Sequence, residues 1–257
     1  MLVDTHCHLD AGEFDGDRDQ VIARARAAGV TRQVVPAIHA ADWPNLRGIC
    51  AATDGLFPAY GLHPMFLAEH RPEHLSQLRD WIVRECPVAV GECGLDYFVE
   101  GLDHDAQQRY FEGQLALARE HDLPVIVHAR RAVDAVVASI RGAGRLRGVV
   151  HSWSGSRQQA EQLWDLGFLL GIGGPVTYGR AKRLRKLIAD MPLEHLLLET
   201  DAPDQPDSEN RGKRNEPARL RTVCETVADL RGVSPEEIAR VTTGNAERLF
   251  GLPPPPA

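Results

Sequence analysis

Short apolar segments rich in β-branched residues recur along the chain, and stretches with helical spacing of apolar residues lie between them. The apolar segments occupy residues 2–3, 30–38, 56–61, 88–91, 125–127, 148–150, 168–172 and 196–198. Several of them show no strict alternation, which is typical of parallel strands that are covered on both faces. Amphipathic helices are predicted between them at residues 19–28, 72–85, 106–121, 156–166 and 180–189.

This alternation of strands and helices favours an α/β fold. Eight units in 257 residues average about 32 residues each, the size of a βα unit. Because no linker interrupts the pattern, we predict a single (β/α)8 TIM barrel that forms one domain over residues 1–257, with a frayed proline-rich tail at 253–257. A doubly wound open sheet is the alternative. That fold favours a glycine-rich phosphate loop after the first strand, where this chain instead has the sequence DTHCH at 4–8.

Composition and charge narrow the class of protein. The chain is 43% hydrophobic and 25% charged, which is typical of a globular protein and excludes a disordered or fibrous one. A net charge of −7 argues against coating nucleic acid or an anionic membrane through bulk electrostatics, although a local cationic site is compatible with it. The five cysteines are irregularly spaced, and no signal peptide or membrane span is recognisable. We therefore expect reduced thiols and a cytoplasmic location.

The first candidate chemistry is the pair His6 and His8, directly after the first strand. Residues two apart on a strand point to the same side, so both imidazoles are expected to face the barrel lumen while Cys7 faces the helices. Two converging imidazoles at the catalytic end of a barrel would form half of a metal site. A pair of histidines that serve only packing is the alternative.

Residues with metal-binding side chains follow the apolar segment in five later units as well. These residues are His63, Glu92, His128, His151 and Asp201. Burying this many unpaired polar side chains at one end of the barrel would destabilise the fold unless a ligand binds them. Four of these five histidines together with the two carboxylates suit two divalent cations, one carboxylate being able to bridge them.

The motifs around these residues resemble those of the TatD family of metal-dependent hydrolases, within the amidohydrolase-like barrels, over nearly the whole chain. They are DTHCHL at 4–9, GLHP at 61–64, GECGLDY at 91–97, LPVIVHAR at 123–130, HSWSG at 151–155, ETDAP at 199–203, RNEP at 214–217 and NAERLF at 245–250. Two positions depart from the family pattern. Met65 stands where a histidine is usual, and Trp153 where a phenylalanine is usual. Both are expected near the mouth of the site, so they concern the substrate and not the metals.

The resemblance implies a ligand set and an activity. One metal would be held by His6, His8, Glu92 and Asp201. A second metal would be held by His128 and His151, with Glu92 bridging the two. The activity described for the family is metal-dependent hydrolysis, mainly of DNA and often from an end of the strand.

A mechanism follows from these residues. Two cations held by Glu92 and its neighbours would turn a shared water into hydroxide at neutral pH, and Asp201 would pass the proton of that water to the leaving oxygen. His63 and Arg130 are candidates for orienting a phosphate, with a surface role at the start of a helix as the alternative for Arg130. Trp153 is a candidate for stacking on a base, and packing on a loop is its alternative.

Three further features have open interpretations. Asp96 either orients a ligand imidazole or forms a turn. The basic residues at 180–186 form a solvated helix face, whereas those at 211–214 lie on the predicted catalytic rim and are better placed to contact substrate phosphates. The NEP sequence at 215–217 is expected to start a helix with proline in its first turn.

The leading hypothesis is therefore a two-metal deoxyribonuclease that binds DNA as a substrate and not as a stable partner. The alternative enzyme is a two-metal hydrolase of another ester or amide, on a small molecule or an aminoacyl-tRNA type of substrate. A non-catalytic metal-binding scaffold is the alternative outside the enzymes. Zinc, magnesium, manganese, nickel and cobalt all suit the ligand set. The preference for DNA or RNA and the oligomeric state are left open, a monomer being compatible with the sequence.

Overall fold

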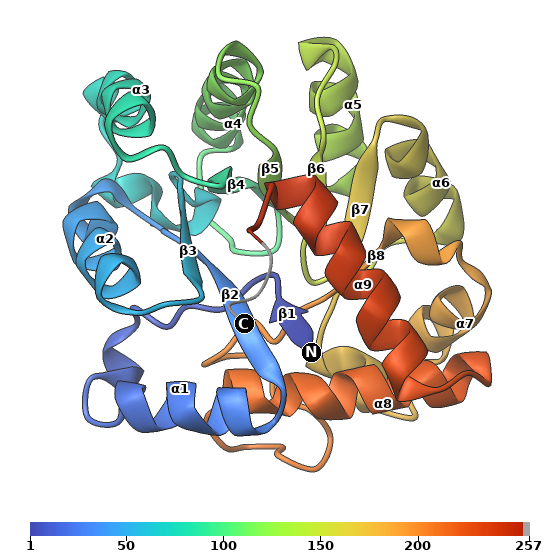
Figure 1. The fold of residues 1–257 in the computed structure, drawn as a ribbon. Helices are drawn as coiled ribbons and strands as arrows, with labels where there is room; N and C mark the ends of the chain where they lie inside the picture. The colour runs from blue at the N-terminus through green and yellow to red at the C-terminus, as the bar shows by residue number, and fades with distance from the viewer. Residues whose placement is uncertain (254–257) are drawn as a thin grey trace.

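In the computed structural model, which describes residues 1–253, eight parallel strands follow one another around a barrel in the order of the sequence (Figure 1). The strands are β1 (Leu2–Asp4), β2 (Val30–Pro36), β3 (Leu56–Tyr60), β4 (Ala89–Asp96), β5 (Val125–Arg130), β6 (Gly148–Val150), β7 (Phe168–Ile172) and β8 (Leu196–Leu198). Hydrogen bonds just beyond the strand ends join the last strand to the first. The Thr5 N–H donates to the Leu198 carbonyl at 3.0 Å, and the Asp201 N–H to that of His6 at 2.9 Å. The predicted (β/α)8 barrel is confirmed.

Helices surround the strands, as Figure 1 shows. They are α1 (Arg18–Ala27), α2 (Trp43–Ala52), α3 (Glu73–Glu85), α4 (His104–Glu120), α5 (Val133–Ala143), α6 (Arg157–Asp165), α7 (Lys182–Asp190), α8 (Leu220–Arg231) and α9 (Pro235–Phe250). The five predicted helices are present, with ends that differ by one or two residues. The NEP sequence leads into a 3-10 helix, Pro217–Arg219, that continues into α8, as its proline predicts. Of the predicted tail, all but Pro253 lies outside the described residues.

The barrel interior is filled from one end by helix α9. An inner apolar cluster takes one residue from each of seven strands, including Val34 of β2 and Ile126 of β5. Leu249 and Phe250 of α9 pack against that cluster. In Figure 1 the helix crosses the end of the barrel at which the N-terminus lies. This end is closed by packing, so the opposite, carboxyl end of the strands is the one left for chemistry.

Two strands extend further than their apolar segments predict. β4 continues through Glu92 to Asp96, and β5 continues through His128 to Arg130. Polar residues therefore lie inside these strands and not after them. At the first strand the opposite holds, because β1 ends at Asp4 and His6 lies beyond it.

Among the described residues, the structure contains neither a membrane-spanning helix nor a disulfide. Among residues 1–253, no helix combines the length and the apolar composition needed to span a bilayer. All five cysteines carry free thiols, as their irregular spacing predicts.

Asn245 joins helix α9 to the start of β8. Its buried amide donates to the carbonyls of Leu193 at 2.7 Å and Leu196 at 2.8 Å. We expect Asn245→Ala to lower the free energy of unfolding by about 1–3 kcal/mol, since both buried carbonyls would lose their donor. Equilibrium urea unfolding measures this. The exposed Arg240 on the same helix provides the control: if Asn245→Ala costs no more than Arg240→Ala, the amide does not anchor α9.

Candidate metal centre

Each residue predicted to bind metal lies at the carboxyl end of the barrel, and together they form one cluster. Glu92 is at its centre, 2% exposed and surrounded by imidazoles. Its two carboxylate oxygens face different sets of residues. The family resemblance implies two sets of ligands, and the structure shows which oxygen of Glu92 each set faces.

The first group surrounds Glu92 Oε2. This oxygen lies 3.1 Å from His6 Nε2 and 3.5 Å from His8 Nε2. The two histidine nitrogens lie 3.2 Å apart, so the expected convergence of this pair is present. Asp201 Oδ1 completes the group, at 3.5 Å from His6 Nε2 and 3.6 Å from His8 Nε2. These are the four residues that the resemblance assigns to one metal.

The second group surrounds Glu92 Oε1. The nearest nitrogens are His151 Nε2 at 2.8 Å, His63 Nε2 at 2.9 Å and His128 Nδ1 at 3.1 Å. His128 Nδ1 and His151 Nε2 are themselves 3.2 Å apart. His63, predicted to orient substrate, thus lies within bonding distance of the central carboxylate.

Two glycines allow the close packing of this centre. Gly94 lies beside His128 across the β4–β5 pair with a φ of +143°, and a Cβ atom there would come 2.0 Å from the His128 carbonyl oxygen. A Cβ at Gly171 would come 2.0 Å from a carboxylate oxygen of Glu199. Any larger side chain at either position would displace a residue of the centre.

The charges of the cluster favour a cation. Burial opposes ionisation of Asp201, but its hydrogen bond with His8 and the neighbouring imidazoles lower its pKa to about 2. Burial also opposes a charge on His8, yet the Asp201 bond and the charge of Glu92 raise the pKa of His8 to about 9. Burial lowers the pKa of His6 to about 4, which leaves the neutral imidazole that binds metals. The carboxylates therefore attract positive charge, as protons on imidazoles or as a metal ion.

The arrangement fits metal ions. Ligand atoms around a tetrahedral ion at about 2.0–2.1 Å lie about 3.3 Å from one another. The separations within the two groups run from 2.8 to 3.6 Å. Three sets of side chains each have their ligand atoms within 4.8 Å of one another: His6, His8 and Glu92; His63, Glu92 and His128; and His6, His151 and Glu199. Among the described residues, the buried atoms His6 Nδ1, His151 Nδ1 and Glu199 Oε2 have no hydrogen-bond partner.

Asp96 supports the centre from behind His128. Its Oδ2 lies 2.9 Å from His128 Nε2, while its Oδ1 accepts hydrogen bonds from the Phe98 and Val99 N–H groups. Both predicted roles of Asp96 are therefore present, one on each oxygen. Because Nε2 faces Asp96, the nitrogen of His128 that faces the cluster is Nδ1.

Glu199, to which the sequence assigned no individual role, is 1% exposed beside His151. Its carboxylate accepts a hydrogen bond from the Ser152 N–H and lies 3.8 Å from His151 Nδ1. Burial raises its pKa to about 8, although the charge of His151 acts in the opposite direction. The sequence did contain a signal for this residue, because Glu199 directly follows the apolar run at 196–198, two residues before Asp201.

Trp153, a candidate for stacking on a base, is only 3% exposed. Its ring lies against Gly155, where a Cβ atom would come 2.4 Å from it. This placement agrees with the alternative, packing on a loop, and leaves little of the ring exposed to a base.

Arg130, the other residue expected to orient a phosphate, is exposed at the end of β5. Its guanidinium carbon lies 3.7 Å from the centroid of the Phe98 ring. The charged end therefore remains at the surface of the rim, next to an aromatic ring.

The basic loop at 211–214 is less available to substrate than predicted. Arg214 forms two bonds to Asp17, with nitrogen–oxygen distances of 2.7 and 2.8 Å, and donates to the Glu13 carbonyl. Its guanidinium is thus engaged in holding the loop against the start of α1. Arg211 and Lys213 are exposed.

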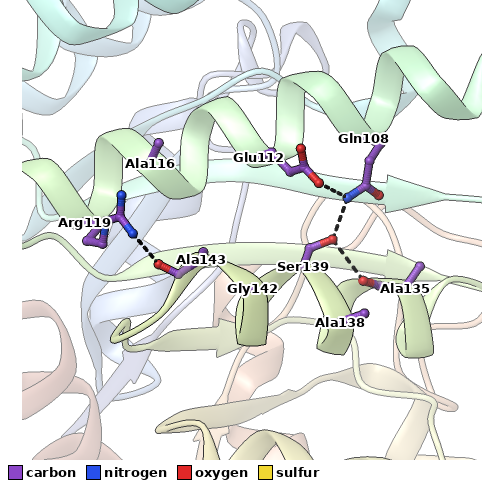
Figure 2. A pocket seen from close by; sticks show the side chains of 9 residues that line it. All are labelled: Gln108, Glu112, Ala116, Arg119, Ala135, Ala138, Ser139, Gly142 and Ala143. Atoms are coloured by element: carbon purple, nitrogen blue, oxygen red, sulfur yellow. Dashed lines mark hydrogen bonds between the residues drawn. The ribbon is translucent and has the colours of Figure 1, made fainter.

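A cavity of about 610 Å³ lies away from this centre, between helices α4 and α5 (Figure 2). Small residues of α5, including Ala135 and Gly142, line it, together with Gln108 and Glu112 of α4. Gln108 donates to Glu112 and Ser139, so these polar side chains lining the cavity bond to one another. No member of the metal cluster borders this cavity, and the candidate chemistry stays at the barrel mouth.

Known proteins match the chain over nearly its whole length. A family model described as TatD related DNase matches residues 3–251. The uncharacterized metal-dependent hydrolase YjjV of Escherichia coli is 41% identical over 255 residues, covering 98% of both chains. The crystal structure of YjjV superposes with a TM-score of 0.94, at 40% identity and 98% coverage of each chain. The 3′-5′ ssDNA/RNA exonuclease TatD of Pantoea ananatis is 34% identical over 259 residues, covering 98% of this chain and all of that protein.

Proposed function

The chain belongs to the family of TatD-related DNases and is a metal-dependent hydrolase, and we propose that it cleaves phosphodiester bonds of DNA from an end of the strand. The observation that carries this proposal is the carboxylate of Glu92, each oxygen of which faces its own group of imidazoles. One buried carboxylate between two such groups suits a pair of divalent cations. The exonuclease named above is a relative at 34% identity, and its activity supports the same choice of bond.

We assign the ligands of each metal ion from the two groups of residues around the oxygens of Glu92. His6, His8, Glu92 and Asp201 would hold one ion; Glu92, His128 and His151 would hold the other, and His63 stands beside the second group. When bound, such ions lower the pKa of water and neutralise the phosphate oxygen that gains charge as the ester is attacked. Neutral imidazoles with oxygen ligands admit zinc, manganese, nickel, cobalt and magnesium.

Residues of the chain would then accept the proton of the attacking water and position the substrate. Asp201 is ionised, and Gln205 holds its Oδ2 through a hydrogen bond of 2.5 Å while Oδ1 faces the histidines. This placement suits Asp201 as the acceptor of the proton from the attacking water and as its donor to the leaving oxygen. Arg130, exposed at the rim, would orient a phosphate of the entering strand.

An assay of nucleotide release tests the proposal. The purified protein is stripped with a chelator, dialysed, and supplied with each divalent metal in turn. Single-stranded DNA labelled at the 5′ or the 3′ end, and the matching RNA, serve as substrates. We expect metal-dependent release of mononucleotides from one end. Hydrolysis of a lactone or an aminoacyl ester, with no cleavage of either nucleic acid under any metal, would instead establish the alternative ester or amide hydrolase.

Asp96→Asn tests the support of the second metal group. Asp96 accepts the Nε2 proton of His128, which leaves Nδ1 free to bind metal. An asparagine NH2 group at this position would favour a proton on Nδ1 instead. We expect the metal concentration needed for half-maximal activity to rise about 10- to 100-fold.

The exposed Asp80 on α3 gives the matched control, because Asp80→Asn removes the same charge away from the cluster. If both variants require the same metal concentration as the unmodified protein, Asp96 does not act through His128. Urea unfolding of both variants separates loss of metal from loss of fold.

A further inference from the structure

Phe98 and two arginines form a small exposed cluster at the rim of the barrel. Phe98 is 42% exposed, although large apolar side chains are usually buried. The guanidinium carbons of Arg130 and Arg131 lie 3.7 and 4.6 Å from the centroid of its ring. Among residues 1–253, neither guanidinium forms an ion pair or a side-chain hydrogen bond with the protein. We call these three residues the arginine clamp.

The arginine clamp is tied to the metal centre through Asp96. One oxygen of this buried carboxylate contacts His128, and the other accepts the N–H of Phe98 at 2.8 Å. The N–H of Tyr97 donates to the Arg130 carbonyl at 2.9 Å, which joins the same loop to the end of β5. The backbone of Phe98 is therefore held next to the second metal group.

The backbone directs both arginines to this ring. Arg130 lies two residues after His128 on β5, so the two side chains leave the strand on the same side. Arg131 has a φ of +54°, a left-handed conformation that is uncommon for a non-glycine residue. This conformation turns the chain so that the second guanidinium also reaches Phe98.

We propose that the arginine clamp binds a phosphate next to the one that is cleaved, and that the protein therefore selects strands with several phosphates over small phosphodiesters. A guanidinium offers a fork of donors that matches phosphate oxygens. Stacking on Phe98 restricts both side chains before substrate arrives, which reduces the entropy lost on binding. In a chain with a net charge of −7, two unpaired arginines beside a metal centre are a local site for a polyanion. This inference rests on the proposed nuclease function and adds the substrate class.

A comparison of two substrates distinguishes a loss of phosphate binding at the arginine clamp from a loss of hydrolysis at the metal centre. One is a decathymidine, which carries several phosphates. The other is bis(p-nitrophenyl) phosphate, which carries one phosphodiester. For the metal-loaded variants Arg131→Gln and Phe98→Leu, we expect the ratio of kcat/KM on decathymidine to kcat/KM on the small ester to fall about 10-fold. The slope of log KM for decathymidine against log salt should also decrease by about 0.7 for each phosphate contact that is lost.

Two matched variants control for charge and for apolar surface. Arg141 is exposed at the end of α5 on the closed side of the barrel, and Val83 is 64% exposed on α3. Arg141→Gln and Val83→Ala should leave the ratio as it is in the unmodified protein. An unaltered ratio and salt slope in Arg131→Gln and Phe98→Leu would overturn the arginine clamp.

Failure of the clamp and failure of the nuclease function give different results. If the unmodified protein degrades decathymidine and the clamp variants do so equally well, only the clamp is wrong. If it hydrolyses the small ester but not decathymidine, the nuclease function is wrong. Fluorescence anisotropy of labelled decathymidine with the metal-loaded, otherwise unmodified protein then decides whether the clamp binds at all. Weaker binding by metal-loaded Arg131→Gln supports the clamp, and equal or undetectable binding overturns it.

Discussion

Replacing Glu92 by Gln is expected to lower metal-dependent hydrolysis by this protein about 1,000-fold or more. The two oxygens of Glu92 face separate groups of imidazoles, so one substitution affects both proposed metals. A glutamine keeps the size of the side chain but removes the charge and replaces one ligand oxygen with an NH2 group. Losing about 4 kcal/mol of transition-state stabilisation corresponds to about 1,000-fold in rate. The measurements are kcat/KM on single-stranded DNA and the metal content of the purified protein.

Glu236→Gln is the control for this substitution, because Glu236 is exposed in the first turn of α9 at the closed end of the barrel. It should retain full activity. If Glu92→Gln bound as much metal as the unmodified protein and kept activity within about tenfold of it, the ligand assignment and the mechanism would both be wrong.

Removal of metal by a chelator is expected to lower the melting temperature by about 5–10 °C and to abolish activity. A ligand at 100 times its dissociation constant stabilises the folded state by about 2.7 kcal/mol. For a chain of this length, each kcal/mol corresponds to about 2–4 °C. Without a metal ion, only protons on the imidazoles balance the negative charge of the buried carboxylates. Differential scanning calorimetry with and without chelator measures the shift.

Two comparisons make this result specific. Adding back a divalent metal should restore both the melting temperature and the activity. In Glu92→Gln the chelator should change the melting temperature by much less, since that variant lacks the central ligand. An equal shift in both proteins would mean that the chelator acts somewhere other than at this cluster.

Continuous apolar runs were predicted most accurately. The strands at 148–150, 168–172 and 196–198 begin and end where the sequence predicts. β4 and β5 were predicted too short, because Glu92 and His128 interrupt the apolar pattern although both strands continue past them, with a shift of register between Val90 and Cys93. A polar side chain inside a strand is stable here because it faces the other members of the cluster.

The sequence predicted which residues form the candidate site better than it predicted how they are arranged. Residues directly after the apolar runs lie at one end of a parallel barrel, so the sequence alone brings His6, Glu92 and His151 together. It does not show that His63 contacts Glu92, nor that the loop after β6 covers Trp153. Those outcomes depend on side-chain packing.

By itself, the sequence determined the alternating order of strands and helices and the residue types at the mouth of the barrel, because both depend on periodicity and position along the chain. Only the tertiary structure decided which oxygen of Glu92 each set of ligands faces and that His63 contacts the same carboxylate. It also decided which arginines remain available. Arg214 pairs with Asp17 across 197 positions, whereas Arg130 stacks on Phe98 and keeps its donors exposed. Such contacts join residues that are distant in the chain, and they form only when the barrel closes.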